Sequence, residues 1–184
     1  MITTGYFDIE TTNLNADFGI VLCAVIQDDQ GNEIILRGDQ LNKSWKTKRS
    51  DDSILVGKVA EALSPYDIIV GHNGLLFDIA FLRTRLLRWG LGAFPDKKLI
   101  DPWMIAKRKL RMHSNSLRSL CDFLTTSEKT EVLGDVWMRC AYDGDTEAMD
   151  YIVEHCRQDV RMLADLTTVI KPYIHQFDSW GSSK

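Results

Sequence analysis

Long hydrophobic runs, a secretory leader and paired cysteine motifs are all missing from this 184-residue sequence. No apolar stretch approaches the roughly 20 residues that are needed to span a bilayer, and no basic-then-apolar segment opens the chain. The cysteines are widely spaced and form no metal-binding pair, so we interpret them as reduced thiols: Cys23, Cys121, Cys140 and Cys156. We therefore expect a soluble, cytoplasmic protein with no membrane partner.

Repeats, linkers and low-complexity tracts are missing too. The hydrophobic content of 45% is ordinary for a globular protein. A chain of this length can bury a substantial core without disulfide support, so we expect residues 1–184 to form a single domain.

Positive charge is scarce overall but concentrated in one segment. The whole chain carries a net charge of −4, whereas residues 83–118 contain ten basic residues against two acids and carry +8. Such a segment can be a solvated helix face, or it can hold a polyanion such as nucleic acid beside an acidic centre. The sequence leaves both alternatives open.

The hydrophobic pattern predicts a mixed α/β domain. Strands are expected at five places: residues 6–10, 21–26, 33–36, 67–71 and 99–100. Short turns join the first three strands, which favours an antiparallel meander, and helices separate the last two, which favours parallel strands. Helices are expected over residues 53–63, residues 77–89 and most of the chain beyond Pro102, with a loop around residues 125–129.

Two carboxylates interrupt the first predicted strand, Tyr6-Phe7-Asp8-Ile9-Glu10. Strand side chains alternate, so Asp8 and Glu10 share one face while Phe7 and Ile9 share the other. Buried carboxylates are costly, and a divalent cation is a common compensation. An Asp-x-Glu pair alone is also common by chance, with one solvated acid and one helix cap as the alternative.

Two further acids occupy informative positions. Asp78 ends a segment that follows the fourth strand and leads into a helix, where open α/β sheets place their sites. A favourable interaction with the helix dipole is the alternative for Asp78. Asp159 lies one helical turn from His155, next to the apolar side of a long predicted helix. The alternative for Asp159 is a surface ion pair with Arg157 or Arg161.

Together these segments resemble the three motifs of the DEDD superfamily, which comprises 3′→5′ exonucleases with a ribonuclease H-like fold. The matching segments are residues 8–14, 73–78 and 155–159, in the family's order and spacing over about residues 2 to 170. Gly144-Asp145 before the last helix is similar to the branch that contains family B polymerase proofreading domains. The resemblance implies a five-stranded mixed sheet flanked by helices.

The resemblance also implies site residues. Two Mg²⁺ or Mn²⁺ ions would be held by Asp8, Glu10, Asp78 and Asp159. Hard cations prefer such oxygen ligands, and a pair of ions can activate water and stabilise the charge that grows on a phosphodiester. Asp8 would be the ligand shared by both ions. The substrate contacts would be Thr11, Thr12, Leu14, Asn73 and Phe77, with Leu14 wedged against a base.

The last motif departs from both forms of the family. One form places Tyr four residues before the final Asp, and the other places His five residues before it. His155 has the identity of the second form at the spacing of the first. The resemblance implies that His155 positions or deprotonates the attacking water, and a structural histidine at the edge of the site is the alternative.

The expected function is therefore hydrolysis of single-stranded DNA or RNA from its 3′ end to nucleoside monophosphates. The alternative is a non-catalytic nucleic-acid-binding or scaffold module that keeps the fold. The presence of all four acids favours the enzyme. A proofreading role would require a separate polymerase as partner, since the sequence contains no polymerase domain.

Several other residues receive structural roles. Asp101 precedes Pro102 and is expected to cap the following helix. The five tryptophans are too dispersed to predict a base-stacking platform, so we assign most of them to the core: Trp45, Trp89, Trp103, Trp137 and Trp180.

Overall fold

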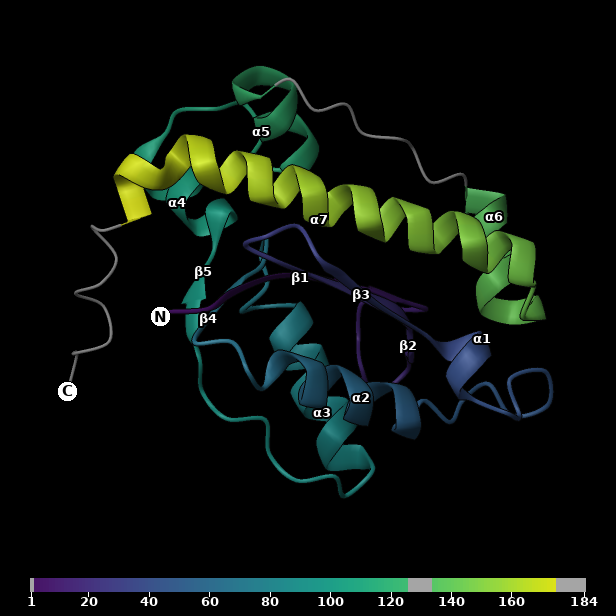
Figure 1. Ribbon diagram of the computed structural model, residues 1–184. Helices are drawn as coiled ribbons and strands as arrows, with labels where there is room; N and C mark the ends of the chain where they lie inside the picture. Colours follow the sequence, from purple (N-terminus) through teal and green to yellow (C-terminus); the bar gives the residue numbers. More distant parts are fainter. Residues whose placement is uncertain (1, 126–133, 175–184) are drawn as a thin grey trace.

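A twisted five-stranded sheet lies between two layers of helices in the computed structural model, which describes residues 2–125 and 134–174 (Figure 1). The strands are β1 (Thr4–Thr11), β2 (Val21–Asp28), β3 (Glu33–Arg37), β4 (Ile68–Val70) and β5 (Lys98–Ile100). Their order is β3-β2-β1-β4-β5. The first three strands form an antiparallel meander, and β4 and β5 run parallel to β1. The predicted fold class is confirmed.

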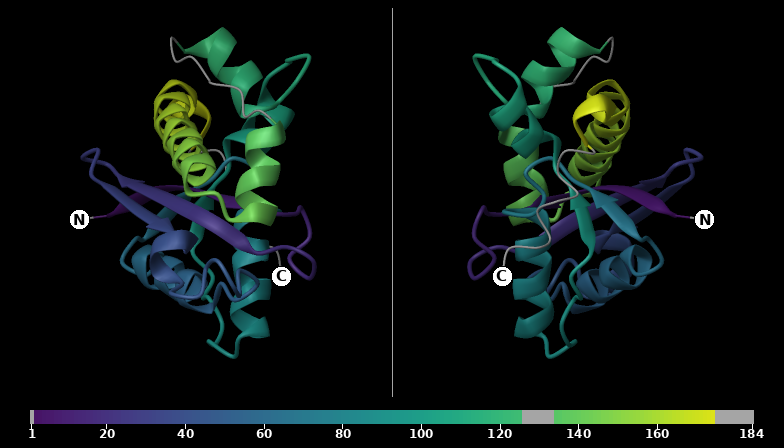
Figure 2. Two further views of the ribbon diagram at one scale, coloured as in Figure 1. Left: turned by 90° about the vertical axis from the view of Figure 1, so that its right-hand side faces the viewer. Right: turned by 90° about the vertical axis from the view of Figure 1, so that its left-hand side faces the viewer.

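Seven helices and one π-helical turn are found in the described part of the chain. Helices α2 (Ser53–Leu63) and α3 (Asp78–Arg88) cover one face of the sheet. The long helix α7 (Thr146–Ile174) crosses the other face, with α4 (Pro102–Lys109) and α5 (Leu117–Leu124) packed against it. Figure 2 shows the sheet from the side, between these layers. The shorter elements are α1 (Gly38–Leu41), α6 (Gly134–Met138) and the π-turn η1 (Arg139–Asp143).

Two apolar cores follow from the alternation of the strands. Phe7 and Ile9 of β1 are 1% and 3% exposed and pack against α2 and α3. On the opposite face, Leu22 and Val25 of β2 pack against Ile152 of α7. All four cysteines are buried free thiols, as expected. No helix among residues 2–125 and 134–174 is long and apolar enough to cross a membrane.

The structure shifts several predicted boundaries by one or two residues. β4 comprises residues 68–70 rather than 67–71. Asp67 lies outside the strand because its carboxylate accepts a hydrogen bond from the N–H of Thr3 at 2.9 Å, and Gly71 enters a turn. The loop expected around residues 125–129 lies, after Thr125, outside the described residues.

Candidate active site

Asp8 and Glu10 project from β1 on the face that α7 crosses. Both side chains are half-buried, whereas Phe7 and Ile9 point into the opposite core. Ligand atoms of Asp8, Glu10 and Cys156 all lie within 4.8 Å of one another. The pairing of β1 with β2 shifts register directly after Glu10, and such bulges commonly redirect side chains at functional sites.

Asp78 reaches the same place from the other helical layer. It is the first residue of α3 and only 3% exposed, and its Oδ1 accepts a hydrogen bond from the N–H of Ile9 at 3.2 Å. Beyond Tyr6, β1 no longer pairs with β4, so this N–H lies at an uncovered stretch of the strand. The hydrogen bond attaches Asp78 to the main chain between Asp8 and Glu10.

The ionised form of Asp78 is disfavoured by its surroundings. Burial is the main cause that raises the pKa of Asp78 to about 7; the hydrogen bond from Ile9 acts against this rise, and the charge of Asp101 adds to it. Asp101 caps α4 as predicted, since its Oδ1 accepts a hydrogen bond from the N–H of Trp103 at 3.0 Å. Burial also raises the pKa of Asp101. Its buried Oδ2 has no hydrogen-bond partner within the described residues.

The turn that delivers Asp78 is held by the same Asp101 carboxylate. The N–H of Asn73 donates to Asp101 Oδ1 at 2.9 Å, and the carbonyl of Asn73 accepts from the N–H of Phe77 at 3.0 Å. Asn73 has a left-handed backbone with φ of 61°. A Cβ on Gly74 would lie 2.9 Å from the Cα of Gly71, so this close turn requires glycine.

Helix α7 places His155 and Asp159 over the β1 acids. His155 Nε2 lies 4.0 Å from Glu10 Oε1 and 3.8 Å from Asp159 Oδ2. His155 and Asp159 are 8% and 9% exposed. Arg157 and Arg161, the partners that the alternative interpretation offered to Asp159, both pair with Glu33 of β3 at 2.8 Å.

Cys156 is a site residue that the sequence interpretation missed. Its Sγ lies 3.3 Å from Asp8 Oδ2. Burial raises the pKa of this thiol well above its usual value, and the charges of Asp8 and Glu10 act in the same direction. The thiol is therefore a neutral donor to Asp8. Its position three residues before Asp159 on one helix face was the available signal.

A cavity of about 310 Å³ opens beside Glu10 at the end of β1. Its lining includes Thr11, Thr12, Leu14 and Phe77, four of the five expected substrate contacts, but not Asn73. Both threonine hydroxyls are engaged within the loop: Thr11 Oγ1 donates to the Asn13 carbonyl at 2.8 Å, and Thr12 Oγ1 accepts from the N–H of Ile20 at 3.0 Å. Leu14 is 80% exposed at the rim. Trp137 of α6 also lines this cavity.

A buried ion pair anchors the loop that carries Leu14. Arg85 of α3 contacts Asp52 at 2.7 Å, and their side chains are 8% and 2% exposed. Arg85 Nη1 donates to the carbonyl of Ala16 at 3.1 Å, and the Asp52 carboxylate accepts from the N–H of Val21 at 2.9 Å. Both ends of the segment that follows Leu14 are thereby fixed.

The basic segment 83–118 is divided between the two helical layers. Arg85 is buried in the ion pair just described, and Arg83 pairs with Asp96 at 2.6 Å. Both lie on α3, on the far side of the sheet from α7. Lys107 and Lys109 are exposed in the last turn of α4, in the same layer as α7. The segment is therefore not one continuous surface.

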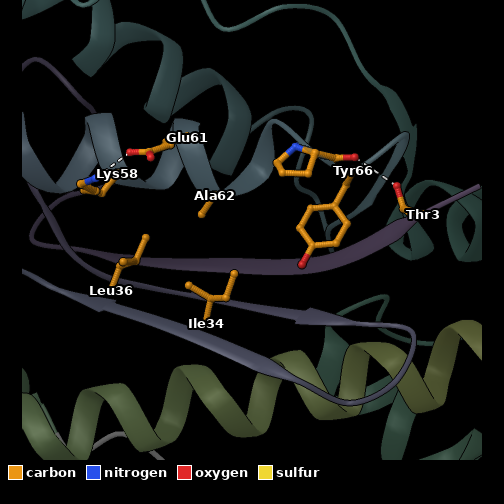
Figure 3. A pocket seen from close by; sticks show the side chains of 8 residues that line it. Thr3, Ile34, Leu36, Lys58, Glu61, Ala62 and Tyr66 are labelled. Atoms are coloured by element: carbon orange, nitrogen blue, oxygen red, sulfur yellow. Dashed lines mark hydrogen bonds and ion pairs between the residues drawn. The ribbon is translucent and has the colours of Figure 1, made fainter.

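A larger hollow of about 480 Å³ lies on the opposite face of the sheet, between β3 and α2 (Figure 3). Ile34, Leu36 and Ala62 form much of its wall. The acid in its lining, Glu61, is paired with Lys58 at 2.7 Å. This hollow has no grouped carboxylates in its lining, so the smaller cavity beside Glu10 is the better candidate.

The donor set at the end of β1 fits a hard divalent cation. Carboxylate oxygens predominate, and Cys156 is the soft atom among them, held neutral by burial. Burial of Asp78 beside Asp101 leaves negative charge poorly compensated, which a bound cation would relieve.

Comparison with known proteins agrees with this geometry. The RNase H superfamily profile matches residues 5–171. The chain belongs to the RNase H superfamily.

One curated protein and one solved structure with similarity to this chain are DNA polymerases by name. The chain is 28% identical over 133 residues to a PolC-type DNA polymerase III of Ureaplasma parvum, covering 62% of this chain and 9% of the relative. The family B DNA polymerase of the archaeon Pyrobaculum calidifontis superposes with a TM-score of 0.77 at 18% identity, over 97% of this chain and 26% of that one. The first similarity covers only a small part of that polymerase's length, and the second shows the fold.

Proposed function

We propose that this chain is a metal-dependent 3′→5′ exonuclease that hydrolyses single-stranded DNA or RNA to nucleoside monophosphates. The observation that supports this function is the arrangement of acids around the end of β1, beside a cavity of about 310 Å³. Asp8 and Glu10 lie on the strand, Asp78 accepts a hydrogen bond from its main chain, and His155 lies between Glu10 and Asp159. Both relatives are DNA polymerases by name, so a separate polymerase is a candidate partner.

The acids Asp8, Glu10, Asp78 and Asp159 would hold two Mg²⁺ or Mn²⁺ ions, which supply an activated water and stabilise charge on the phosphate oxygens. The neutral thiol of Cys156 donates a hydrogen bond to Asp8 Oδ2 and thereby orients this carboxylate. His155 Nε2, between Glu10 and Asp159, is the atom that would accept the proton of the attacking water.

The cavity supports the polarity of the reaction. Leu14 and Phe77 form apolar walls next to Glu10, so a terminal nucleotide held by them would present its phosphodiester to the acids. By the resemblance to the DEDD superfamily, Leu14, which is 80% exposed at the rim, would wedge against the base of the 3′-terminal nucleotide. The site therefore favours a free, unpaired 3′ end.

The function is tested with oligonucleotides labelled at either end, in DNA and RNA form, with Mg²⁺, Mn²⁺ or chelator. We expect stepwise shortening from the 3′ end that chelator abolishes. Asp8→Asn should remove the activity while the protein stays folded, because the change removes a ligand of both ions. Glu61→Gln, in the hollow on the opposite face, is the matched control and should retain activity.

An Asp8→Asn protein with full activity would refute the assignment. If wild-type protein binds the oligonucleotides but never shortens them, the non-catalytic binding module is the correct alternative. Cleavage of circular single strands would instead identify an endonuclease.

A further inference from the structure

The cavity beside Glu10 has an aromatic wall. The indole of Trp137 lines it together with Leu14 and Phe77. Trp137 is half-buried, with part of its surface packed on the α7 side of the sheet. Trp45 is the contrasting case, since it is 4% exposed and its Nε1 donates to the carbonyl of Gly144 at 3.3 Å. Trp45 is a core residue, whereas Trp137 presents surface to a hollow.

The segment that carries Trp137 is firmly attached. Cys140, three residues further on, is buried against Met149 of α7. Arg139 pairs with Asp145 at 3.2 Å, next to the start of α7. Figure 1 shows α6 beside the first turns of α7. The main chain that follows Trp137 is therefore attached to α7, which lowers the entropic cost of ordering this segment when a base stacks on the indole.

We propose that Trp137 stacks on the base of the 3′-terminal nucleotide. This inference rests on the proposed function and specifies how the site recognises the end of its substrate. Every nucleobase has a flat π-face, so stacking on an indole does not depend on the sequence of the substrate. Leu14 and Phe77 complete the apolar lining, so the base is recognised by stacking while the acids contact the phosphate.

The test compares two oligonucleotides that differ only in the 3′-terminal nucleotide, which carries a base in one and is abasic in the other. Wild-type protein should have the lower KM for the terminus with a base. Trp137→Ala should raise that KM by roughly 5- to 150-fold, the range for one base–aromatic stack. It should leave the KM for the abasic terminus nearly unchanged. Trp137→Phe, which keeps a ring, should retain most of the preference.

Two variants guard against a general structural effect. Trp103→Ala removes another half-buried tryptophan, one that contacts Lys107 on α4 and does not line the cavity. It should affect both oligonucleotides equally. Trp137→Leu keeps an apolar side chain without a π-face. If the alanine variant fails to fold, the same comparison of KM values is made with Trp137→Leu.

An equal loss on both oligonucleotides in Trp137→Leu, or no loss on either, would overturn the inference. Binding of AMP and ribose 5-phosphate gives a readout without hydrolysis. Trp137→Leu should weaken the binding of AMP and leave the binding of ribose 5-phosphate unchanged. If wild-type protein cleaves neither oligonucleotide, the proposed function fails, and this binding comparison still tests the stacking.

Discussion

Asp78→Asn should stabilise the protein in chelator at neutral and alkaline pH. Asp78 is 3% exposed, and burial beside Asp101 raises its pKa from 3.8 to about 7. An asparagine has the same shape and keeps an oxygen that can accept the hydrogen bond from Ile9. The change therefore removes a buried charge while retaining the contact.

The sign of the pH dependence follows from the two protonation states. Between about pH 4 and pH 7 the folded protein keeps the Asp78 proton that the unfolded chain has lost, so the free energy of unfolding falls as pH rises. A shift of this size corresponds to at most about 4 kcal/mol, at about 1.4 kcal/mol per pH unit. Relaxation around the charge reduces this value, so we expect a gain of about 1–3 kcal/mol for Asp78→Asn at pH 8.

The assay is urea denaturation at pH 4 and pH 8, with chelator or with Mg²⁺. The gain in chelator should be present at pH 8 and be small near pH 4, where Asp78 is neutral in the folded protein and only partly ionised in the unfolded chain. Mg²⁺ at a hundred times its dissociation constant should stabilise wild-type protein by about 2.7 kcal/mol, and the variant by less. Asp17→Asn, which removes an exposed carboxylate, should change stability by at most about 0.5 kcal/mol. An Asp78→Asn protein that is less stable than wild type at pH 8 in chelator would refute the reasoning.

Three other predictions concern the substrate and its hydrolysis. A 3′-phosphate should block degradation of an oligonucleotide that is otherwise shortened, as followed on a sequencing gel. His155→Ala should lower kcat by roughly 10²–10⁴-fold, whereas His155→Tyr, which restores the Tyr form of the motif, should retain much more activity; equal kcat in Ala and wild type would make His155 structural. Raising salt should weaken oligonucleotide binding measured by anisotropy. The double variant Lys107→Gln, Lys109→Gln should flatten this dependence, and Arg83→Gln, in the other helical layer, should leave it unchanged.

The sheet could be predicted because it depends on local patterns, and the same patterns place each acid on its own element, whereas the four-acid set itself was implied by the resemblance to the DEDD superfamily. Alternation within one strand decides that Asp8 and Glu10 share a face. The carboxyl end of β4 is close to the adjacent β1, so Asp78 at the following turn had to approach them. Helical spacing places His155 and Asp159 on one side of α7. How α7 packs across β1 is not contained in these local patterns.

The residues that were missed depend on such packing. Trp137 reaches the cavity only because η1 and the start of α7 bring α6 back to the end of β1. Arg85 stands in a basic run and resembles a surface residue, yet Asp52, 33 positions earlier, makes it a buried loop anchor. In the sequence Cys156 resembles an ordinary core thiol, and its contact with Asp8 exists only because α7 packs across β1. Spacing along the chain carries no information about the contacts of Trp137 and Arg85, whereas the helical spacing of Cys156 from Asp159 was an available signal.

The orientation of Asp8 and Glu10 is determined by the same strand register that buries the core residues of β1. Phe7 and Ile9 are buried under α2 and α3, and a slip of β1 by one residue would expose them to the α7 face and bury the acids instead. The free energy of burying two large apolar side chains, about 1.5–3 kcal/mol each, opposes that slip. Burial of Phe7 and Ile9 in the opposite core thus keeps Asp8 and Glu10 on the face that α7 crosses, and it offsets the mutual repulsion of the acids.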